Sequence, residues 1–196
     1  MTDTDRSDPF ARFIEWFDQV KASGIPEPEA MTLATASKEG RPSARVMLLR
    51  GFDERGAVFY TNYTSRKSDE LGSNPHAALL FYWEKLGWQV RIEGELSRVS
   101  EQESDAYWAT RPRLNQIGGW ASHQSQPLKT NEELDQRVAQ FEAKFQGISI
   151  PRPPHWGGFR LRPERFEFWI RGDGRLHTRE EYRRSGEVWT RRWLNP

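Results

Sequence analysis

The clearest hydrophobic pattern near the start of the chain repeats every three to four residues, as on one face of a helix. Asp8 supplies a capping carboxylate and Pro9 suits the first helical position, while Ser23 and Gly24 form a typical helix end. The pattern therefore predicts an amphipathic helix that packs on the core. Its apolar positions are Phe10, Phe13, Ile14, Phe17 and Val20.

A different pattern dominates the middle of the chain, where short β-branched and aromatic runs alternate with turn residues. These runs predict strands over 31–37, 46–49, 57–61, 76–83 and 88–99. The polar, glycine-bounded segment 51–56 predicts a hairpin loop between the second and third strands. In the fifth strand Trp88, Val90 and Ile92 alternate with polar residues, which is typical of a half-buried strand.

Capping residues and prolines predict how the remaining segments are divided. Ser65 begins a short helix to Leu71, and the pair Ser100 and Glu103 forms a capping box for a helix to Thr110. A polar loop over 111–128 follows, and then a helix from Thr130 to about Gly147. A stiff proline connector leads to strands over 158–161, 166–170 and 187–194. Sequential hairpins with inserted helices predict a mostly β antiparallel barrel of the α+β class, as one domain over 1–196 with residues 1–7 as a flexible tail.

Composition excludes several classes of protein. The net charge is +1, but 151–196 holds eleven arginines and no lysine and carries +5, against −4 for the remainder. There is no cysteine, which excludes disulfides and thiolate chemistry and fits a cytoplasmic protein. The N-terminus has no apolar segment of a signal peptide, and no apolar run is long enough for a membrane span. The four histidines lack metal-ligand spacing, and the sequence has no GxGxxG, P-loop or GxSxG motif.

The start of the short helix at Arg66 and Lys67 is electrostatically unusual. Two cations in a first helical turn oppose the helix dipole, whereas a bound phosphate would reverse the repulsion. Ser65 and the free backbone N–H groups would complete such an anion site. The alternative is a solvated polar helix start.

Three other groups of residues are candidates for binding. Arg175, His177 and Arg179 share a face if the chain there is extended, so they suit an anion or an electron-rich ring, or else a solvent-facing edge strand. Tyr107 and Arg111 lie four residues apart and can hold a phosphate or form a surface pair. The polar side chains of Gln89, Gln124 and Ser125 can bond to the edge of a heterocycle, or lie free on the surface.

A set of motifs along nearly the whole chain resembles a known family. The motifs are Gly40-Arg41-Pro42-Ser43-Ala44-Arg45, Phe59-Tyr60-Thr61-Asn62, Ser65-Arg66-Lys67, Arg111-Pro112-Arg113, Gln124-Ser125, Trp156-Gly157-Gly158, Glu167-Phe168-Trp169, Arg175-Leu176-His177 and the ending Leu194-Asn195-Pro196. In this order they resemble the pyridoxine (pyridoxamine) 5′-phosphate oxidase family, whose members use FMN to make pyridoxal 5′-phosphate. The resemblance implies a split barrel that works as a homodimer, with FMN at the subunit interface.

The resemblance also implies roles for individual residues. The flavin would be bound by Arg45, Tyr60, Thr61, Arg66, Lys67, Gln89, Gln124, Ser125, Trp169 and Arg179. The substrate phosphate would be bound by Arg50, Tyr107, Arg111 and Asn115, while Arg175 and His177 would lie over the substrate ring as the catalytic pair. The implied reaction oxidises pyridoxamine or pyridoxine 5′-phosphate at C4′: a hydride passes to flavin N5, and dioxygen takes the electrons to give hydrogen peroxide. Neither metal, nucleic acid nor membrane is expected.

Four residues depart from the family pattern. Arg50 replaces the usual Lys, Asn115 the usual Ser, Ile170 the usual Gln and Thr178 the usual Asp. The first two alter the substrate-phosphate site, so a second hypothesis is a related flavin oxidase that acts on another ring compound, as phenazine-pathway relatives do. A third hypothesis is a non-catalytic module that binds RNA through its arginine- and tryptophan-rich C-terminal part.

Overall fold

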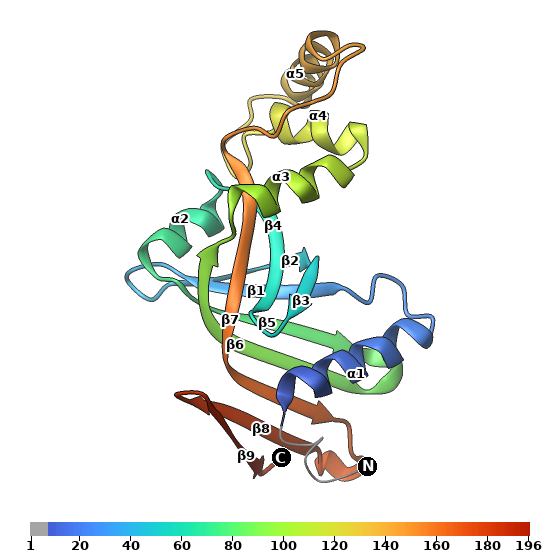
Figure 1. The fold of residues 1–196 in the computed structure, drawn as a ribbon, viewed down its shortest axis with the longest axis vertical. Helices are drawn as coiled ribbons and strands as arrows, with labels where there is room; N and C mark the ends of the chain where they lie inside the picture. The colour runs from blue at the N-terminus through green and yellow to red at the C-terminus, as the bar shows by residue number, and fades with distance from the viewer. Residues whose placement is uncertain (1–7) are drawn as a thin grey trace.

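One curled antiparallel sheet forms the centre of the molecule (Figure 1). The structure is a computed structural model that describes residues 8–196, so the predicted tail, 1–7, lies outside the described residues. Within that range nine strands follow the order β2-β1-β5-β6-β7-β4-β3, and β8 and β9 continue the sheet from β7. The mostly β, α+β prediction is confirmed. The strands are β1 (Ala30–Ala36), β2 (Pro42–Leu48), β3 (Gly51–Asp53), β4 (Gly56–Asn62), β5 (His76–Trp83), β6 (Trp88–Arg98), β7 (Trp156–Ile170), β8 (Thr178–Ser185) and β9 (Val188–Leu194).

Helix α1 (Pro9–Ala22) packs across the sheet and covers one side of the core (Figure 1). The Asp8 carboxylate accepts a hydrogen bond from the Phe10 N–H at 2.9 Å, as the capping prediction requires. Phe13 is fully buried between Phe52 and Phe81, at ring-centroid distances of 4.4 and 5.3 Å. The helix prediction is therefore confirmed.

The packed face of α1 is rotated slightly from the predicted one. Ile14 was expected in the core but is 45% exposed, whereas Trp16 is buried and stacks on Trp88. Phe13, Trp16 and Val20 follow the i, i+3, i+7 spacing of one helical stripe, and Ile14 lies about 100° around the helix from Phe13. Hydropathy alone did not distinguish the helix face that carries Ile14 from the face that carries Trp16.

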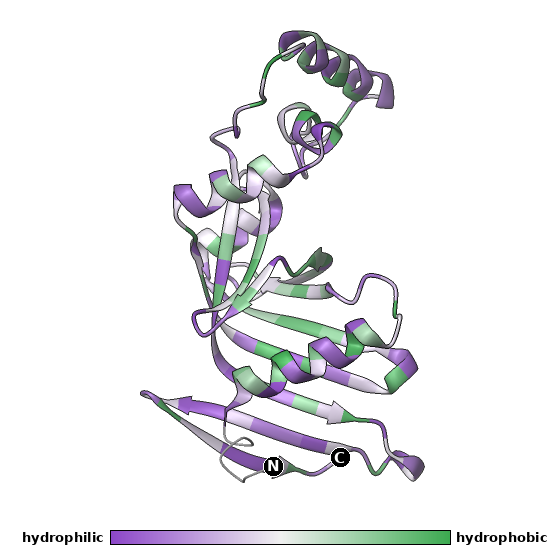
Figure 2. Cartoon of the chain, turned by 45° about the vertical axis from the view of Figure 1, so that its right-hand side comes forward, coloured by the Kyte–Doolittle hydropathy of each residue, from purple (hydrophilic) through white to green (hydrophobic). Residues whose placement is uncertain are grey.

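Three helices form a separate arm at the end of the sheet where β7 begins (Figures 1 and 2). They are α3 (Glu101–Thr110), α4 (Arg113–Ala121) and α5 (Asn131–Lys144). The arm has its own small core of Trp108, Ile117, Phe145, Ile150 and Trp156. The Trp108 indole donates to the Ile150 carbonyl at 2.8 Å, which ties α3 to the chain that precedes the proline connector. The predicted capping bonds of Ser100 and Thr130 are both present.

The predicted polar loop over 111–128 is wrong in its first half, because α4 occupies that segment. Ile117 and Ala121 are buried on one face of α4. Gly119 allows close packing, since an added Cβ would lie 2.8 Å from the Trp108 ring. Two adjacent glycines lower helix propensity, so only the packing against α3 reveals this helix.

Two other predictions about the strands are also wrong. The hairpin that precedes the short helix α2 (Arg66–Ser73) joins β3 to β4, and β2 pairs with β1 instead. The separate strands predicted over 158–161 and 166–170 form the single strand β7, with a register shift opposite Gly94 that accommodates Pro163. Strand β8 was missed because its charged residues do not resemble a strand that is buried on one face. In residues 8–196 no helix is long and apolar enough to cross a membrane.

Candidate functional site

A polar pocket of about 340 Å³ lies between β4, the start of β7 and the helical arm. Met47, Tyr60, Thr61, the segment 111–124 and Trp156 all contribute to its lining, so four separate segments supply its walls. Gln124 and Ser125 come from the turn after α4, where Ser125 has a positive φ of 68°. The fold thus brings several of the predicted phosphate- and flavin-binding residues to one place.

Lys67 provides a buried positive charge beside this pocket. Its Nζ donates to the Thr61 and Ser65 hydroxyls and to the Gln124 side-chain carbonyl, each at 2.9 Å. The residue is only 6% exposed, and among residues 8–196 no carboxylate lies within ion-pair distance of its Nζ. Burial, with the nearby Arg45, lowers the pKa of Lys67 from 10.5 to about 8. A buried ammonium that contacts only neutral acceptors fits a bound anion such as a phosphate.

The backbone at the start of α2 also suits a bound anion. The Ser65 side chain makes no capping bond to the helix, because its hydroxyl donates to the Asn62 carbonyl at 2.8 Å. The Ser68 and Asp69 N–H groups donate to the Ser65 carbonyl, so it is the Arg66 and Lys67 N–H groups at the helix end that have no side-chain cap, an arrangement that suits an anionic group.

Arg45 and Arg66, the other two cations expected to bind the flavin phosphate, share a counter-ion that the sequence did not reveal. Glu70 pairs with both Arg45, at 3.2 Å, and Arg66, at 2.9 Å. Burial alone would raise the pKa of Glu70, but hydrogen bonds from Ser43, Thr35 and Arg66 and the charge of Arg45 lower it to about 2. Glu70 is therefore ionised, and the cluster of three cations and one carboxylate keeps a net positive charge. The spacing of four residues between Arg66 and Glu70 was the available signal.

Arg111 is held against aromatic rings at the other side of the pocket. Tyr60, Tyr107 and Trp156 form a near-parallel stack, with centroid distances of 4.0 Å from Tyr60 to Tyr107 and 5.5 Å from Tyr60 to Trp156. The Arg111 guanidinium lies 4.8 Å from the Trp156 ring centre. Its buried Nε has no hydrogen-bond partner within residues 8–196, and burial lowers the pKa of the group. An unpartnered buried donor here fits an anionic oxygen.

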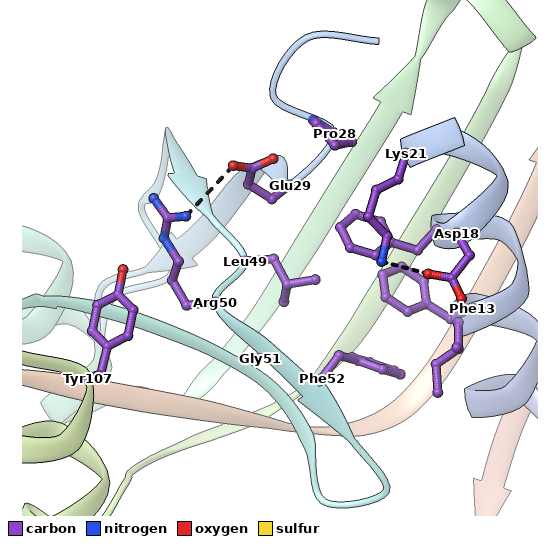
Figure 3. A pocket seen from close by; sticks show the side chains of 12 residues that line it. Phe13, Asp18, Lys21, Pro28, Glu29, Leu49, Arg50, Gly51, Phe52 and Tyr107 are labelled. Carbon is purple, nitrogen blue, oxygen red and sulfur yellow. Dashed lines mark ion pairs between the residues drawn. The ribbon is translucent and has the colours of Figure 1, made fainter. Parts of the chain in front are cut away.

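Arg50 lies beside Tyr107, on the rim of a second, more apolar pocket of about 570 Å³ (Figure 3). Its guanidinium pairs with Glu29 at 3.7 Å. The electrostatic effect of Arg50 on the pKa of Arg111 places the two cations near each other. Of the predicted substrate-phosphate set, Arg50 and Tyr107 line this pocket, whereas Arg111 and Asn115 line the first one. Glu29 is a contact that sequence reasoning missed.

The remaining flavin candidates lie far from this pocket, near the other end of β7. Gln89 on β6 is opposite Trp169 on β7, which is in turn opposite Arg179 on β8. The three side chains therefore form one row across the sheet, on the face opposite the core.

Arg175 and His177 lie next to that row, but not on an extended strand. The conditional prediction of a shared face over 175–179 is wrong, because Arg175 ends the short turn η3 (Asp173–Arg175) with a φ of 65° and β8 begins only at Thr178. The His177 Nδ1 accepts from the Gly172 N–H at 3.2 Å, and the His177 ring lies 4.6 Å from the Trp169 ring. A left-handed arginine is a strained conformation of the kind that functional sites retain.

The length of β7 separates the two sets of candidates within one chain. Thr61 pairs with Gly157 at its start, and Gln89 pairs with Trp169 near its end. Twelve residues of strand span roughly 40 Å. The two sets of candidate residues therefore lie too far apart for one small cofactor to contact both within one chain.

Two family models match most of the chain. Residues 17–145 match the family described as pyridoxamine 5′-phosphate oxidase, and residues 156–196 match the pyridoxine 5′-phosphate oxidase C-terminal dimerisation region. The chain is 57% identical to a pyridoxine/pyridoxamine 5′-phosphate oxidase of Rubrobacter xylanophilus, over 96% of this chain and 87% of the relative. It is 52% identical to the protein of the same name from Myxococcus xanthus, over 96% of this chain and 92% of the relative.

Two solved structures are similar in fold. PhzG from Burkholderia lata, in complex with tetrahydrophenazine-1-carboxylic acid, has a TM-score of 0.92 and 37% identity, over 97% of this chain and 93% of the other. A pyridoxamine 5′-phosphate oxidase-related, FMN-binding protein from Nostoc punctiforme has a TM-score of 0.75 and 22% identity, over 96% and 98% of the two chains. The second likeness concerns the fold alone, and it confirms the predicted split-barrel architecture.

Proposed function

Because the chain belongs to the pyridoxamine 5′-phosphate oxidase family of FMN-dependent oxidases, we propose that it converts pyridoxamine and pyridoxine 5′-phosphates to pyridoxal 5′-phosphate. The observation that carries the proposal is the pair of basic half-sites at the two ends of β7. A homodimer, which the C-terminal dimerisation region supports, can place one half-site of each subunit against the complementary half-site of the other. Two complete sites would then lie at the interface.

The first half-site suits the phosphate end of FMN. Lys67, Arg45 and Arg66 would supply charge, and the Thr61 hydroxyl, Gln124 and Ser125 would supply hydrogen bonds. Tyr60 would line the same pocket. The row of Gln89, Trp169 and Arg179 from the partner subunit would contact the rest of the flavin. The combination of amide, indole and guanidinium provides both hydrogen bonds and a flat apolar surface for a ring system.

The second anion site suits the phosphate of the substrate. Arg111 offers its unpartnered Nε, Tyr107 a phenol, Asn115 an amide and Arg50 a further charge. Arg175 and His177 would approach from the partner subunit, over the ring of the substrate. They would orient the ring and stabilise charge that develops on it, so the main contribution of the protein is position and electrostatics.

When bound, FMN would supply the redox step, since its N5 can accept a hydride from C4′ of the substrate and dioxygen can reoxidise it to give hydrogen peroxide. The chain's own residues would hold the two phosphates at fixed positions and so align C4′ with the flavin. The His177 Nδ1 accepts from the Gly172 N–H, which leaves Nε2 as the ring nitrogen that can face the substrate.

A second candidate function is oxidation of a different ring compound. The similarity to PhzG, which binds a phenazine derivative, favours this alternative, and so do Arg50, Asn115 and Thr178, where the chain departs from the family pattern. Membership of an enzyme family favours either oxidase function over the RNA-binding hypothesis.

Anaerobic mixing of the FMN-loaded protein with pyridoxamine 5′-phosphate separates these functions. The proposal expects the flavin absorbance to bleach, the colour to return with oxygen, and pyridoxal 5′-phosphate and hydrogen peroxide to accumulate. Pyridoxine 5′-phosphate should act in the same way. A protein that stays yellow with both compounds, but bleaches with a reduced phenazine precursor, would overturn the proposal in favour of the alternative.

A further inference from the structure

We propose that Glu167 is a positioning residue of the flavin site, which fixes the guanidinium of Arg179 in the orientation needed to contact FMN. The inference rests on the proposed function, in which Arg179 belongs to the flavin-contacting row. It concerns a buried carboxylate that belongs to neither half-site.

Glu167 lies on β7 two residues before Trp169, so both side chains are on the same face of the sheet. The residue is only 2% exposed, although that face carries many charges. Its Oε1 accepts from the Arg179 Nε at 2.7 Å, and its other oxygen accepts from Arg91. Arg165 is within 3.9 Å. Three arginines thus surround one carboxylate.

The contacts of Arg179 show why this carboxylate decides its orientation. Nε binds Glu167, and Nη1 donates to the Asn195 carbonyl at 3.0 Å. A planar guanidinium that is held at two donors has its third donor group aimed in a fixed direction. Within residues 8–196 the Nη2 of Arg179 has no partner, so this nitrogen is left for a ligand. Without Glu167, only one contact to a backbone carbonyl would restrain the side chain.

The charge of Glu167 has a second consequence. It offsets the positive charge of Arg91, Arg165 and Arg179 next to the row of flavin-contacting residues. Removal of that negative charge would favour the more negative, reduced form of a flavin bound nearby. Glu167 should therefore affect both the affinity for FMN and its reduction potential.

Glu181 offers a matched control. It is also a buried carboxylate on the same face, and it pairs with Arg165, Arg183 and Arg192, but it makes no ion pair with Arg179. A substitution of Glu181 by Gln removes the same chemical group from the same charged network, while the contact to Arg179 remains.

The test measures release of FMN from the FMN-loaded dimer on dilution, by the rise in flavin fluorescence. Glu167→Gln is expected to weaken FMN binding by roughly 10-fold or more, since a charge-assisted hydrogen bond is lost from the residue that contacts the flavin. Glu181→Gln should stay within about 2-fold of the unmodified protein. The reduction potential of bound FMN should be more positive in Glu167→Gln than in Glu181→Gln.

A double-mutant cycle separates positioning from general structural damage. If Glu167 acts through Arg179, the double variant Glu167→Gln/Arg179→Gln should bind FMN no more weakly than Arg179→Gln alone. Losses that multiply in the double variant, or an unchanged affinity in Glu167→Gln, would overturn the inference.

If Glu167→Gln fails to assemble, Arg179→Lys serves as the second variant, because it keeps the charge and loses the two-point contact. It should also release FMN faster, and unchanged release would count against the inference. Failure of the proposed function looks different, because then the unmodified protein binds FMN but does not oxidise the substrates.

Discussion

Replacement of Lys67 by Met should stabilise the flavin-free protein while it weakens the binding of FMN. Burial, with the charge of Arg45, lowers the pKa of Lys67 from 10.5 to about 8, which corresponds to a cost of about 3.4 kcal/mol for holding the charged form in the folded chain. Met removes this cost, but it also leaves three acceptors without their donor, at about 0.5–1.5 kcal/mol each. At about 1 kcal/mol for each acceptor, the expected net gain at pH 7 is about 0.4 kcal/mol.

The pH dependence identifies the origin of that gain. Because the folded pKa of Lys67 is the lower one, the unfolded chain binds the extra proton between pH 8 and 10.5, and the stability of the flavin-free protein rises with pH in this window. The advantage of Lys67→Met should therefore be present below pH 8, vanish within about one pH unit above it, and become a disadvantage by pH 10, where Lys67 is neutral in the folded protein. With FMN bound, the phosphate charge would compensate Lys67, and the order of stability should reverse.

Urea unfolding of flavin-free protein at one fixed protein concentration, from pH 7 to pH 10, measures these differences. Lys129→Met is the matched control, since Lys129 is exposed and its removal should change the free energy of unfolding by less than about 0.5 kcal/mol. FMN binding to Lys67→Met should be at least about 10-fold weaker than to the unmodified protein. A variant that is less stable than the unmodified protein at pH 7, with a difference that does not change up to pH 10, would refute the reasoning that burial of Lys67 without an ion-pair contact destabilises the flavin-free protein.

Three further predictions follow from contacts around the two anion sites. Glu29→Gln should release Arg50 from its only ion pair within residues 8–196 and lower the KM for the phosphorylated substrate by roughly 2- to 5-fold, measured by steady-state oxygen consumption with kcat unchanged. Trp156→Leu should raise that KM by roughly 10-fold, because it removes the ring that supports Arg111; an unchanged KM would mean that the aromatic contact does not position the guanidinium. Glu70→Gln should lower the free energy of unfolding by about 1–3 kcal/mol at pH 7; the folded pKa of Glu70, about 2, lies below the ordinary 4.5. The contribution of Glu70 to the free energy of unfolding is therefore present above pH 4.5 and is lost as the pH falls towards 2. Denaturation curves should show a smaller difference between Glu70→Gln and the unmodified protein at pH 3 than at pH 7.

Local sequence patterns predicted most of the elements correctly. The caps at Asp8, Ser100 and Thr130 depend on residues within three positions of one another, so they need no information from the rest of the chain. The same holds for the alternation in β6. The failures lie where distant contacts override local preference. Helix α4 contains two adjacent glycines that pack against α3, and β8 buries two glutamates whose charges are compensated by arginines of other elements.

The candidate site, like the fold, was predicted from the sequence only where it depends on local residues. The sequence by itself determined which residues can bind phosphate, because the types and spacing of Ser65, Arg66 and Lys67 are local properties. It could not show that Glu70 forms ion pairs with Arg45 and Arg66, while the buried Lys67 makes no ion pair with any carboxylate in residues 8–196. Nor could it show that β7 separates the flavin candidates by roughly 40 Å of strand. Counter-ions and distances depend on strand pairing between residues far apart in the chain, so only the tertiary structure decided that the two sets of candidate residues lie at opposite ends of β7.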